Sequence, residues 1–336
     1  MSTPKKISIF LLLPCVALLV LGGCGGGSAH EPTEVYVLIA SNLNLPYWQA
    51  AAAGIKQAAA ELQVRYEVVG PETYDPQAQH ENFQRLMSRQ VKPTGILISA
   101  AAPDLVRADI DAAIAQGIPV IAIDADAPSS KRLFFIGTDN YRAGVMAAEV
   151  AVKKMQGKGN VAVFTMPEQA NLSQRLRGYQ DTFARYPQIK IVQTVDIKGN
   201  PATAFDAAKE LVLSAKVKPD AFVCLEAIAC AEVADVLNRN QVTEKTVVAM
   251  DTAPDTLDWL KKGVISATVS QKPFTMAYVG LKMLDDIHHH KPQSLETNWA
   301  QDLSSPIPAF VDTGATLVDQ TNVDQFLKSA SASPAK

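Results

Sequence analysis

From Val35 onward, short apolar runs alternate along the chain with longer amphipathic stretches. The apolar runs are rich in valine, isoleucine and phenylalanine and show little alternation with polar residues. This composition is typical of strands that are covered on both faces in a parallel sheet. The pattern predicts strands at Val35–Ala40, Arg65–Val69, Gly95–Ser99, Pro119–Ile123, Asn160–Thr165, Ile189–Val195, Ala221–Leu225, Thr246–Met250 and Ile265–Val269, with a short one at Phe134–Ile136.

The amphipathic stretches between these strands predict helices, and strand–helix–strand repeats form right-handed βαβ units. The repeat occurs twice, over about residues 35–137 and 139–269, and each set has the length of one doubly wound lobe. We therefore expect an α/β protein with two doubly wound, Rossmann-like parallel-sheet lobes. The predicted helices include Trp48–Leu62, Gln77–Gln90, Leu105–Gln116, Ala143–Met155, Gln174–Arg185 and Thr203–Ala215.

The segment after Gln271 is too short for a third domain, so we expect it to complete both lobes by crossing between them. It contains one long predicted helix, Phe274–His290, and a last one near Asn322–Leu327. Crossings are expected near Thr138, Gln271 and Ser304. The N-terminal lobe then comprises residues 34–138 plus 272–303, the C-terminal lobe residues 139–271 plus 304–328, and residues 329–336 a disordered tail.

The first residues resemble an export signal. Two lysines precede an apolar run that ends in Leu21-Gly22-Gly23-Cys24, as in a secretory signal peptide, and the run is too short to span a membrane comfortably. The tetrapeptide resembles a bacterial lipobox, although an ordinary signal peptide with a chance cysteine is the alternative. We expect residues 1–23 to be a signal peptide, Cys24 to carry lipid, and residues 24–33 to be a flexible linker outside the cytoplasm, in the periplasm or at the cell surface.

Composition narrows the function classes. With 336 residues, 48% hydrophobic and 19% charged, the chain is of ordinary globular type. Its formal net charge is −3 and its lysines and arginines are scattered, so we expect no nucleic-acid binding. Cys224 and Cys230 stand beyond the leader, either as buried small hydrophobes or as a disulfide, and both alternatives stay open.

Hydrogen-bonding side chains follow six of the predicted strands, and three of them are carboxylates. Ligands of open parallel sheets bind outside the carboxyl ends of the strands. Helix N-capping is the alternative for each serine or aspartate alone, but glutamate is a poor N-cap, and capping does not require convergence from two lobes. The six residues are Ser41, Ser99, Asp124, Glu226, Asp251 and Gln271.

Carboxylates suit a hydroxyl-rich ligand, because a charged acceptor makes a stronger hydrogen bond than a neutral one. Arg175, at the start of a predicted helix, would supply donors from the second lobe, with Arg177 as its competitor. Tyr47 and Trp48 follow the first strand and offer rings on which the C–H face of a sugar can stack; a place in the core is the alternative. These residues predict a sugar site.

At these residues the chain resembles the periplasmic sugar-binding proteins of the ribose-binding type, over nearly all of Val35 to Leu327. The resemblance implies two lobes joined by three crossovers, which close on a sugar and dock on an ATP-driven permease. It implies ligand contacts at Ser41, Tyr47, Trp48, Ser99, Asp124, Arg175, Glu226, Asp251 and Gln271. The motifs that carry it are Ile39-Ala40-Ser41, Asn44-Leu45-Pro46-Tyr47-Trp48, the run from Gly117 to Asp124, Ile136-Gly137-Thr138-Asp139-Asn140, Arg175-Leu176-Arg177-Gly178-Tyr179, the run from Val248 to Pro254, and Asp312-Thr313-Gly314.

Three positions depart from the ribose-binding pattern. Leu45 stands where these proteins carry asparagine, Ala125 where they carry a ring-contacting arginine, and Glu226 where asparagine is usual. The pocket loses donors and gains an acid, so the expected ligand is donor-rich: a polyol, another sugar or an amino sugar.

Rival functions find less support. None of the five histidines, His30, His80 and His288 to His290, lies at a strand end, and no phosphate loop follows a strand, so we expect no enzyme and no cofactor. The cluster at 288–290 ends a helix, where cations complement the dipole. A DNA-binding regulator would need a helix pair where the leader lies, whereas a sugar-presenting accessory protein for a chemoreceptor or sensor kinase stays an alternative. We expect the protein to be a monomer. Its expected partners are a sugar or polyol, ABC permease subunits and, through the lipid anchor, the membrane.

Overall fold

The first lobe is built on a six-stranded parallel sheet. The computed structural model describes residues 1–2, 30–292, 294–299 and 302–332. The strand order is β11-β5-β4-β3-β1-β2, and every pairing is parallel. The strands are β1 (Val35–Ile39), β2 (Arg65–Val69), β3 (Gly95–Ile98), β4 (Val120–Ile123), β5 (Phe135–Gly137) and β11 (Phe310–Asp312).

The second lobe repeats the first. Its sheet has the order β12-β10-β9-β8-β6-β7, so the strand order reverses beside β6 as it does beside β1. Only the last strand differs in direction, because β12 runs antiparallel to β10. The two-lobed, doubly wound fold expected from the sequence is confirmed. The strands are β6 (Lys158–Thr165), β7 (Gln188–Asp196), β8 (Ala221–Cys224), β9 (Thr246–Met250), β10 (Ala267–Ser270) and β12 (Thr316–Asp319).

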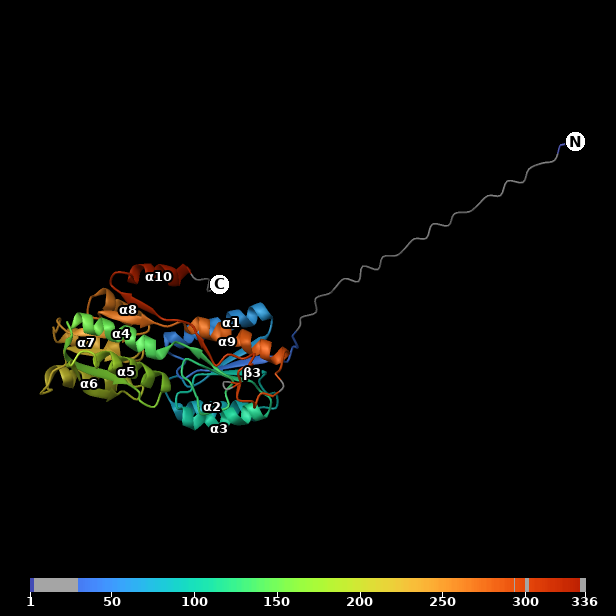
Figure 1. The fold of residues 1–336 in the computed structure, drawn as a ribbon, viewed down its shortest axis with the longest axis horizontal. Coiled ribbons are helices and arrows are strands. Elements are labelled where there is room, and N and C mark those ends of the chain that lie inside the picture. Colours follow the sequence, from blue (N-terminus) through green and yellow to red (C-terminus); the bar gives the residue numbers. More distant parts are fainter. Residues whose placement is uncertain (3–29, 293, 300–301, 333–336) are drawn as a thin grey trace.

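Helices cover both faces of each sheet (Figure 1). In the first lobe, α1 (Pro46–Leu62) packs beside α9 (Pro273–His289) on one face, and α2 (Pro76–Ser88) and α3 (Pro103–Ala115) lie on the other. The second lobe pairs α4 (Asn140–Lys154) with α5 (Ala170–Phe183), and α6 (Pro201–Leu213) with α7 (Ala229–Arg239), next to α8 (Pro254–Lys261). Burial on both faces explains the continuous apolar runs: every residue of β1, β3, β4, β8 and β9 is buried.

Proline marks the start of many of these helices. Six described helices carry proline in their first two positions, where no backbone N–H is needed and the fixed φ suits the helix. The sequence-based starts at Trp48, Leu105 and Thr203 therefore lie two residues too late, because the helices begin at Pro46, Pro103 and Pro201.

The three passages between the lobes lie at residues 137–139, 271–272 and 312–315. The first and third are joined, because Thr313 N–H donates to Gly137 O (2.8 Å) and Asp139 N–H to Asp312 Oδ1 (3.1 Å). The third passage was expected near Ser304. Residues 304–312 instead stay with the first lobe, because β11 pairs with β5 and Ile307 packs in the first core.

Both ends of the folded body differ from the expected boundaries. Residues 30–33 of the expected flexible linker contact the first lobe: His30 Nε2 lies 3.0 Å from Asp285 Oδ1, and Arg65 donates to Thr33 O (3.1 Å). At the other end, α10 (Val323–Ala332) extends through four residues of the expected disordered tail, since alanine favours helix. Residues 3–23 of the leader and Cys24 lie outside the described residues.

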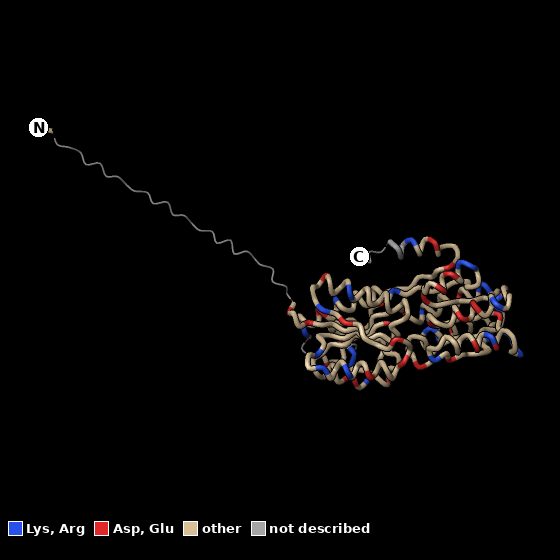
Figure 2. The backbone as a smooth tube through the Cα atoms, turned by 180° about the vertical axis from the view of Figure 1, so that it is seen from behind, with Lys and Arg blue, Asp and Glu red and all other residues tan. Residues whose placement is uncertain are grey.

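Charge is mixed over both lobes. Figure 2 shows lysine and arginine interspersed with aspartate and glutamate along the described backbone. None of the helices in the described part of the chain has the length and apolar character that a membrane-spanning segment needs.

Candidate functional site

The carboxyl ends of the strands in both lobes border one cavity, with about 480 Å³ of empty space, open solvent included. Eight of the nine predicted site residues line it, and Ser99 lies behind the wall. The lining brings together side chains separated by more than two hundred positions. The eight are Ser41, Tyr47, Trp48, Asp124, Arg175, Glu226, Asp251 and Gln271.

Asp124 is the acceptor of the first lobe and follows β4 directly. Tyr47 donates its hydroxyl to Asp124 Oδ1 (2.7 Å), and Ser99 donates to Asp124 Oδ2 (3.0 Å). The two donors come from α1 and from the end of β3, so both neighbouring elements fix the carboxylate. Ser99 is buried and positions Asp124 instead of facing the cavity.

A chain of hydrogen bonds orders the second lobe's side. Gln271 donates to Asp251 Oδ1 (2.9 Å) and accepts from Arg175 Nη2 (2.8 Å). Thr268 also donates to the backbone carbonyl of Asp251 (2.6 Å). The amide of Gln271 is therefore oriented by both neighbours, which leaves the carboxylate of Asp251 held in the cavity wall.

Arg175 is the central cation of the site and is 2% exposed. It donates to Asn140 Oδ1 (2.8 Å) and Leu225 O (2.6 Å) as well as to Gln271. Its position depends on close contact between α4 and α5, because a Cβ on Gly144 would lie 2.2 Å from Arg175 O. Glycine at this point lets the two helices approach, and the guanidinium then reaches the cavity. Arg177, the alternative cation, lies instead on the surface beside Asp181.

Glu226 lines the cavity and also accepts hydrogen bonds at the start of the next helix, two roles that the sequence analysis treated as alternatives. It lines the cavity, and its carboxylate accepts from the amides of Ile228 (2.5 Å) and Ala229 (3.0 Å) at the start of α7. Glu226 lies three residues before the first residue of α7, and its side chain reaches forward to these two amides, whereas the N-cap position itself is Ile228.

A disulfide joins Cys224 to Cys230. It links the end of β8 to α7 across the segment that holds Leu225 and Glu226. The question left open by the sequence is thus resolved in favour of the bridge, which braces the loop carrying two residues of the site.

The carboxylates share one electrostatic environment. Burial raises the pKa of Asp251 to about 6, with Arg175 and Gln271 acting against the rise. Burial also raises the pKa of Glu226 to about 7, against the two backbone amides, and it raises the pKa of Asp124. With one guanidinium among three acids, negative charge remains on the ionised carboxylates, and hydrogen-bond donors of a ligand can stabilise it.

The apolar part of the wall comes from α1. The rings of Tyr47 and Trp48 meet edge to face, with centroids 5.3 Å apart. Trp48 is 3% exposed and packs in the first core while one part of it borders the cavity. Trp48 is therefore part of the core and part of the cavity wall at the same time, so both interpretations are correct.

Several lining residues were not predicted. Tyr74 follows β2 after a longer loop than the strand-end rule covers, and its hydroxyl donates to Ala101 O (3.0 Å). Asn171 and Leu172 lie three or four residues before Arg175 on α5, so helical spacing from that arginine was an available signal. Loop residues gave no such signal. The remaining unpredicted lining residues are Asn42, Met166, Gln169, Ala227 and Ile228.

A polar, acid-lined cavity between two doubly wound lobes defines a ligand-binding protein of the two-lobed type. The comparisons specify the family: residues 36–292 match the model of the periplasmic binding protein domain, and the chain belongs to that family. The D-allose-binding periplasmic protein of Escherichia coli K12 is 26% identical over 270 residues, which are 77% of this chain and 86% of the relative.

Solved structures agree with this assignment. AraP, an arabinose-binding protein from Geobacillus stearothermophilus, is 34% identical with a TM-score of 0.72, covering 87% of this chain and 99% of that one. A solute-binding protein from Burkholderia graminis C4D1M, solved with D-arabinose, is 29% identical with a TM-score of 0.76, covering 87% and 98%. The chain is thus of the sugar-binding, ABC-transporter class of solute-binding proteins, which is extracytoplasmic and not enzymatic.

Proposed function

We propose that this chain is the lipid-anchored, extracytoplasmic sugar-binding component of an ABC importer, and that it holds one monosaccharide or related polyol between its lobes. The observation that carries the proposal is the convergence of Asp124 from the first lobe with Glu226 and Asp251 from the second on one cavity. Each carboxylate can accept hydroxyl hydrogens, and a ligand that bonds to both lobes favours the closed arrangement.

An aldopentose is the first candidate ligand. The neighbours solved as an arabinose-binding protein or with D-arabinose support this choice, as does the small size of the cavity. The positions that depart from the ribose-binding pattern point the same way. Leu45 lines the wall and Ala125 is buried, so neither supplies a donor. We expect arabinose or a polyol to bind more tightly than ribose.

The anchor proposal rests on sequence alone. Leu21-Gly22-Gly23-Cys24 would be cut before the cysteine, and Gly25 to Ala29 would span from the lipid to the folded body. Mass spectrometry of the protein expressed in a bacterium with its leader tests this directly. A mature N-terminus at Cys24 with two or three acyl chains is expected; an unmodified cysteine or a different first residue contradicts it.

Isothermal titration calorimetry tests the sugar proposal. The panel is L-arabinose, D-arabinose, D-xylose, D-ribose, D-allose, D-galactose and ribitol. We expect one member to bind at 1:1 stoichiometry with a Kd of about 10 μM or tighter. The proposal fails if no member binds below about 1 mM, and its ligand assignment fails if D-ribose binds tightest.

A further inference from the structure

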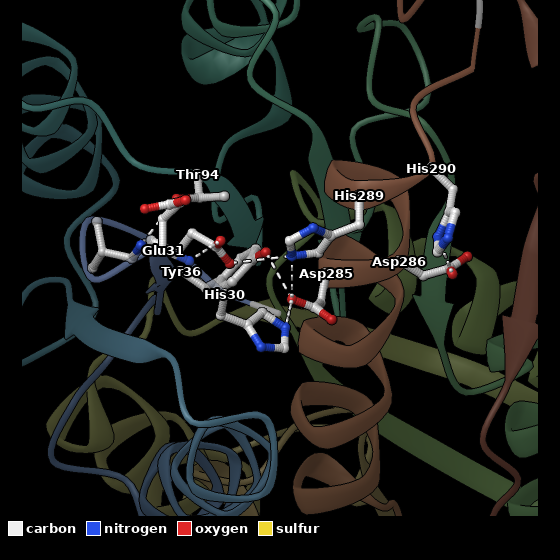
Figure 3. Close-up of polar contacts among 10 residues, drawn as sticks. His30, Glu31, Tyr36, Thr94, Asp285, Asp286, His289 and His290 are labelled. Carbon is white, nitrogen blue, oxygen red and sulfur yellow. Dashed lines mark hydrogen bonds and ion pairs between the residues drawn. The ribbon is translucent and has the colours of Figure 1, made fainter. Parts of the chain in front are cut away.

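Four potential metal ligands meet at the end of the first lobe that faces away from the sugar cavity. His30 and Glu34 precede β1, and Asp285 and His289 lie one turn apart on α9 (Figure 3). One ligand atom from each lies within 4.8 Å of the others. Because Glu34 precedes β1 and the sugar cavity follows the carboxyl ends of the strands, the two sites lie at opposite edges of the sheet.

The distances suit a four-coordinate ion. His30 Nε2 lies 3.0 Å from Asp285 Oδ1, and His289 Nε2 lies 3.3 Å from Glu34 Oε2 and 3.6 Å from Asp285 Oδ1. An ion bound tetrahedrally at about 2.0–2.2 Å separates its ligand atoms by roughly 3.3–3.6 Å. Small side-chain adjustments would therefore admit an ion without moving the backbone.

Burial makes a cation favourable here. Glu34 is 4% exposed and Asp285 is 8% exposed, and two carboxylates removed from water need positive charge nearby. Neutral imidazoles supply lone pairs and not charge. A dication would neutralise both acids and use both imidazole nitrogens at once.

Surrounding groups already orient the two acids. Tyr36 donates its hydroxyl to Asp285 Oδ1 (3.1 Å), and the amide of Glu31 donates to Glu34 Oε1 (2.6 Å). Support of this kind behind the ligands is typical of metal sites.

We propose that His30, Glu34, Asp285 and His289 form a binding site for a divalent transition metal. Zinc is the ion whose preference for imidazole and carboxylate ligands in tetrahedral geometry matches them. Bound metal would fasten residue 30 to α9. The proposed membrane tether would then leave the protein at a fixed point, far from the cavity mouth.

Zinc titration of the protein tests the site. The protein is purified without a polyhistidine tag and stripped with a chelator, and Zn²⁺ binding is followed by calorimetry. We expect one ion per chain with a Kd of about 1 μM or tighter, a higher melting temperature with zinc, and visible tetrahedral d–d bands when Co²⁺ replaces zinc. In the variants Asp285→Asn and His289→Gln, zinc affinity should fall more than about 100-fold, and in Tyr36→Phe about tenfold.

His290→Gln is the matched control, because His290 stands next to His289 but pairs with exposed Asp286 (3.0 Å) on another side of the helix (Figure 3). Its affinity for zinc should equal that of the wild type, and sugar binding by every variant verifies that each one is folded. The proposal is overturned if zinc binds more weakly than about 100 μM, or if His290→Gln weakens binding as much as His289→Gln.

Discussion

Asp124 and Asp251 occupy the same place in the two lobes. Each directly follows the fourth strand of its sheet, β4 or β9, and each has a left-handed backbone, with φ of 62° and 66°. Aspartate is among the few residues that adopt this conformation at low cost. Each carboxylate is also held by neutral side-chain donors: Tyr47 and Ser99 donate to Asp124, and Gln271 donates to Asp251. The lobes therefore present matched acceptors to a ligand between them.

Asp251→Asn should weaken sugar binding. The substitution keeps the shape but replaces a charged acceptor with a neutral amide, a loss of about 1.5–3 kcal/mol, or about 10- to 100-fold in Kd by calorimetry. Asp258→Asn, at an exposed position of α8, should leave Kd unchanged. Equal affinities of Asp251→Asn and the wild type would remove this carboxylate from the site.

Sugar affinity should rise as pH rises from about 5 to about 7. Ligand hydroxyls donate to ionised carboxylates, and the pKa of Asp251 is about 6 and that of Glu226 about 7 in the unliganded protein. In this pH range a fraction of the molecules therefore carries a proton on Asp251 or Glu226. A protonated carboxyl group is a weaker hydrogen-bond acceptor than a carboxylate. Titrations across the range check this, and a flat or falling affinity in both wild type and Glu226→Gln contradicts it.

The same shift sets how stability depends on pH. The pKa of Glu226 rises on folding from 4.5 to about 7, so the folded state binds a proton that the unfolded state releases. This contribution to the free energy of unfolding is full below about pH 4.5 and is lost as pH rises through 7, on the order of 3 kcal/mol. Urea unfolding of the unliganded wild type should show a steeper fall over this range than Glu226→Gln. Identical slopes would refute the shift.

Loss of the disulfide should affect stability and the site together. For the short loop closed by Cys224 and Cys230, chain entropy accounts for about 2 kcal/mol of stability. The double variant Cys224→Ala/Cys230→Ala should lose about this much free energy of unfolding. It should also bind sugar more weakly, because Leu225 and Glu226 lie between the cysteines. If the double variant and the oxidised wild type have the same free energy of unfolding, the disulfide does not have this stabilising role.

Closure of the lobes should depend on Gly199. Tyr74 of the first lobe packs against the second core, and a Cβ on Gly199 would lie 2.4 Å from its ring. Gly199→Ala should therefore disfavour the closed state, weakening sugar binding several-fold and enlarging the ligand-bound radius of gyration in X-ray scattering.

Gly117→Ala is the control for this prediction. Its φ of 78° is also positive, but an added Cβ would have no neighbour within 4 Å, so it has the backbone strain without the clash. If both variants bind sugar equally well, Tyr74 and Gly199 do not govern closure.

The sequence was sufficient for the fold and for most of the site. Apolar runs located the strands because parallel strands are buried on both faces, and the residue after each strand indicated the cavity because those ends share one edge. The rule could not separate Ser99 from Asp124, since which side chain faces the cavity depends on side-chain packing around each strand end. It also missed Tyr74, whose position depends on a loop and on the other lobe.

The third crossing and the histidines show a different limit. The pairing of β11 with β5 is a contact between residues far apart in the chain. The local sequence pattern around Ser304 does not predict it. His30 and His289 likewise come together only through the fold, whereas the sequence showed a cluster at the end of one helix.

The most direct test of the account is a crystal structure of the protein with the tightest-binding sugar of the panel. We expect one monosaccharide between the lobes, with hydroxyls within about 3.0 Å of carboxylate oxygens of both Asp124 and Asp251 and a ring face against Tyr47 or Trp48. A sugar bound elsewhere, or bound in the cavity without contact to either aspartate, would contradict the account.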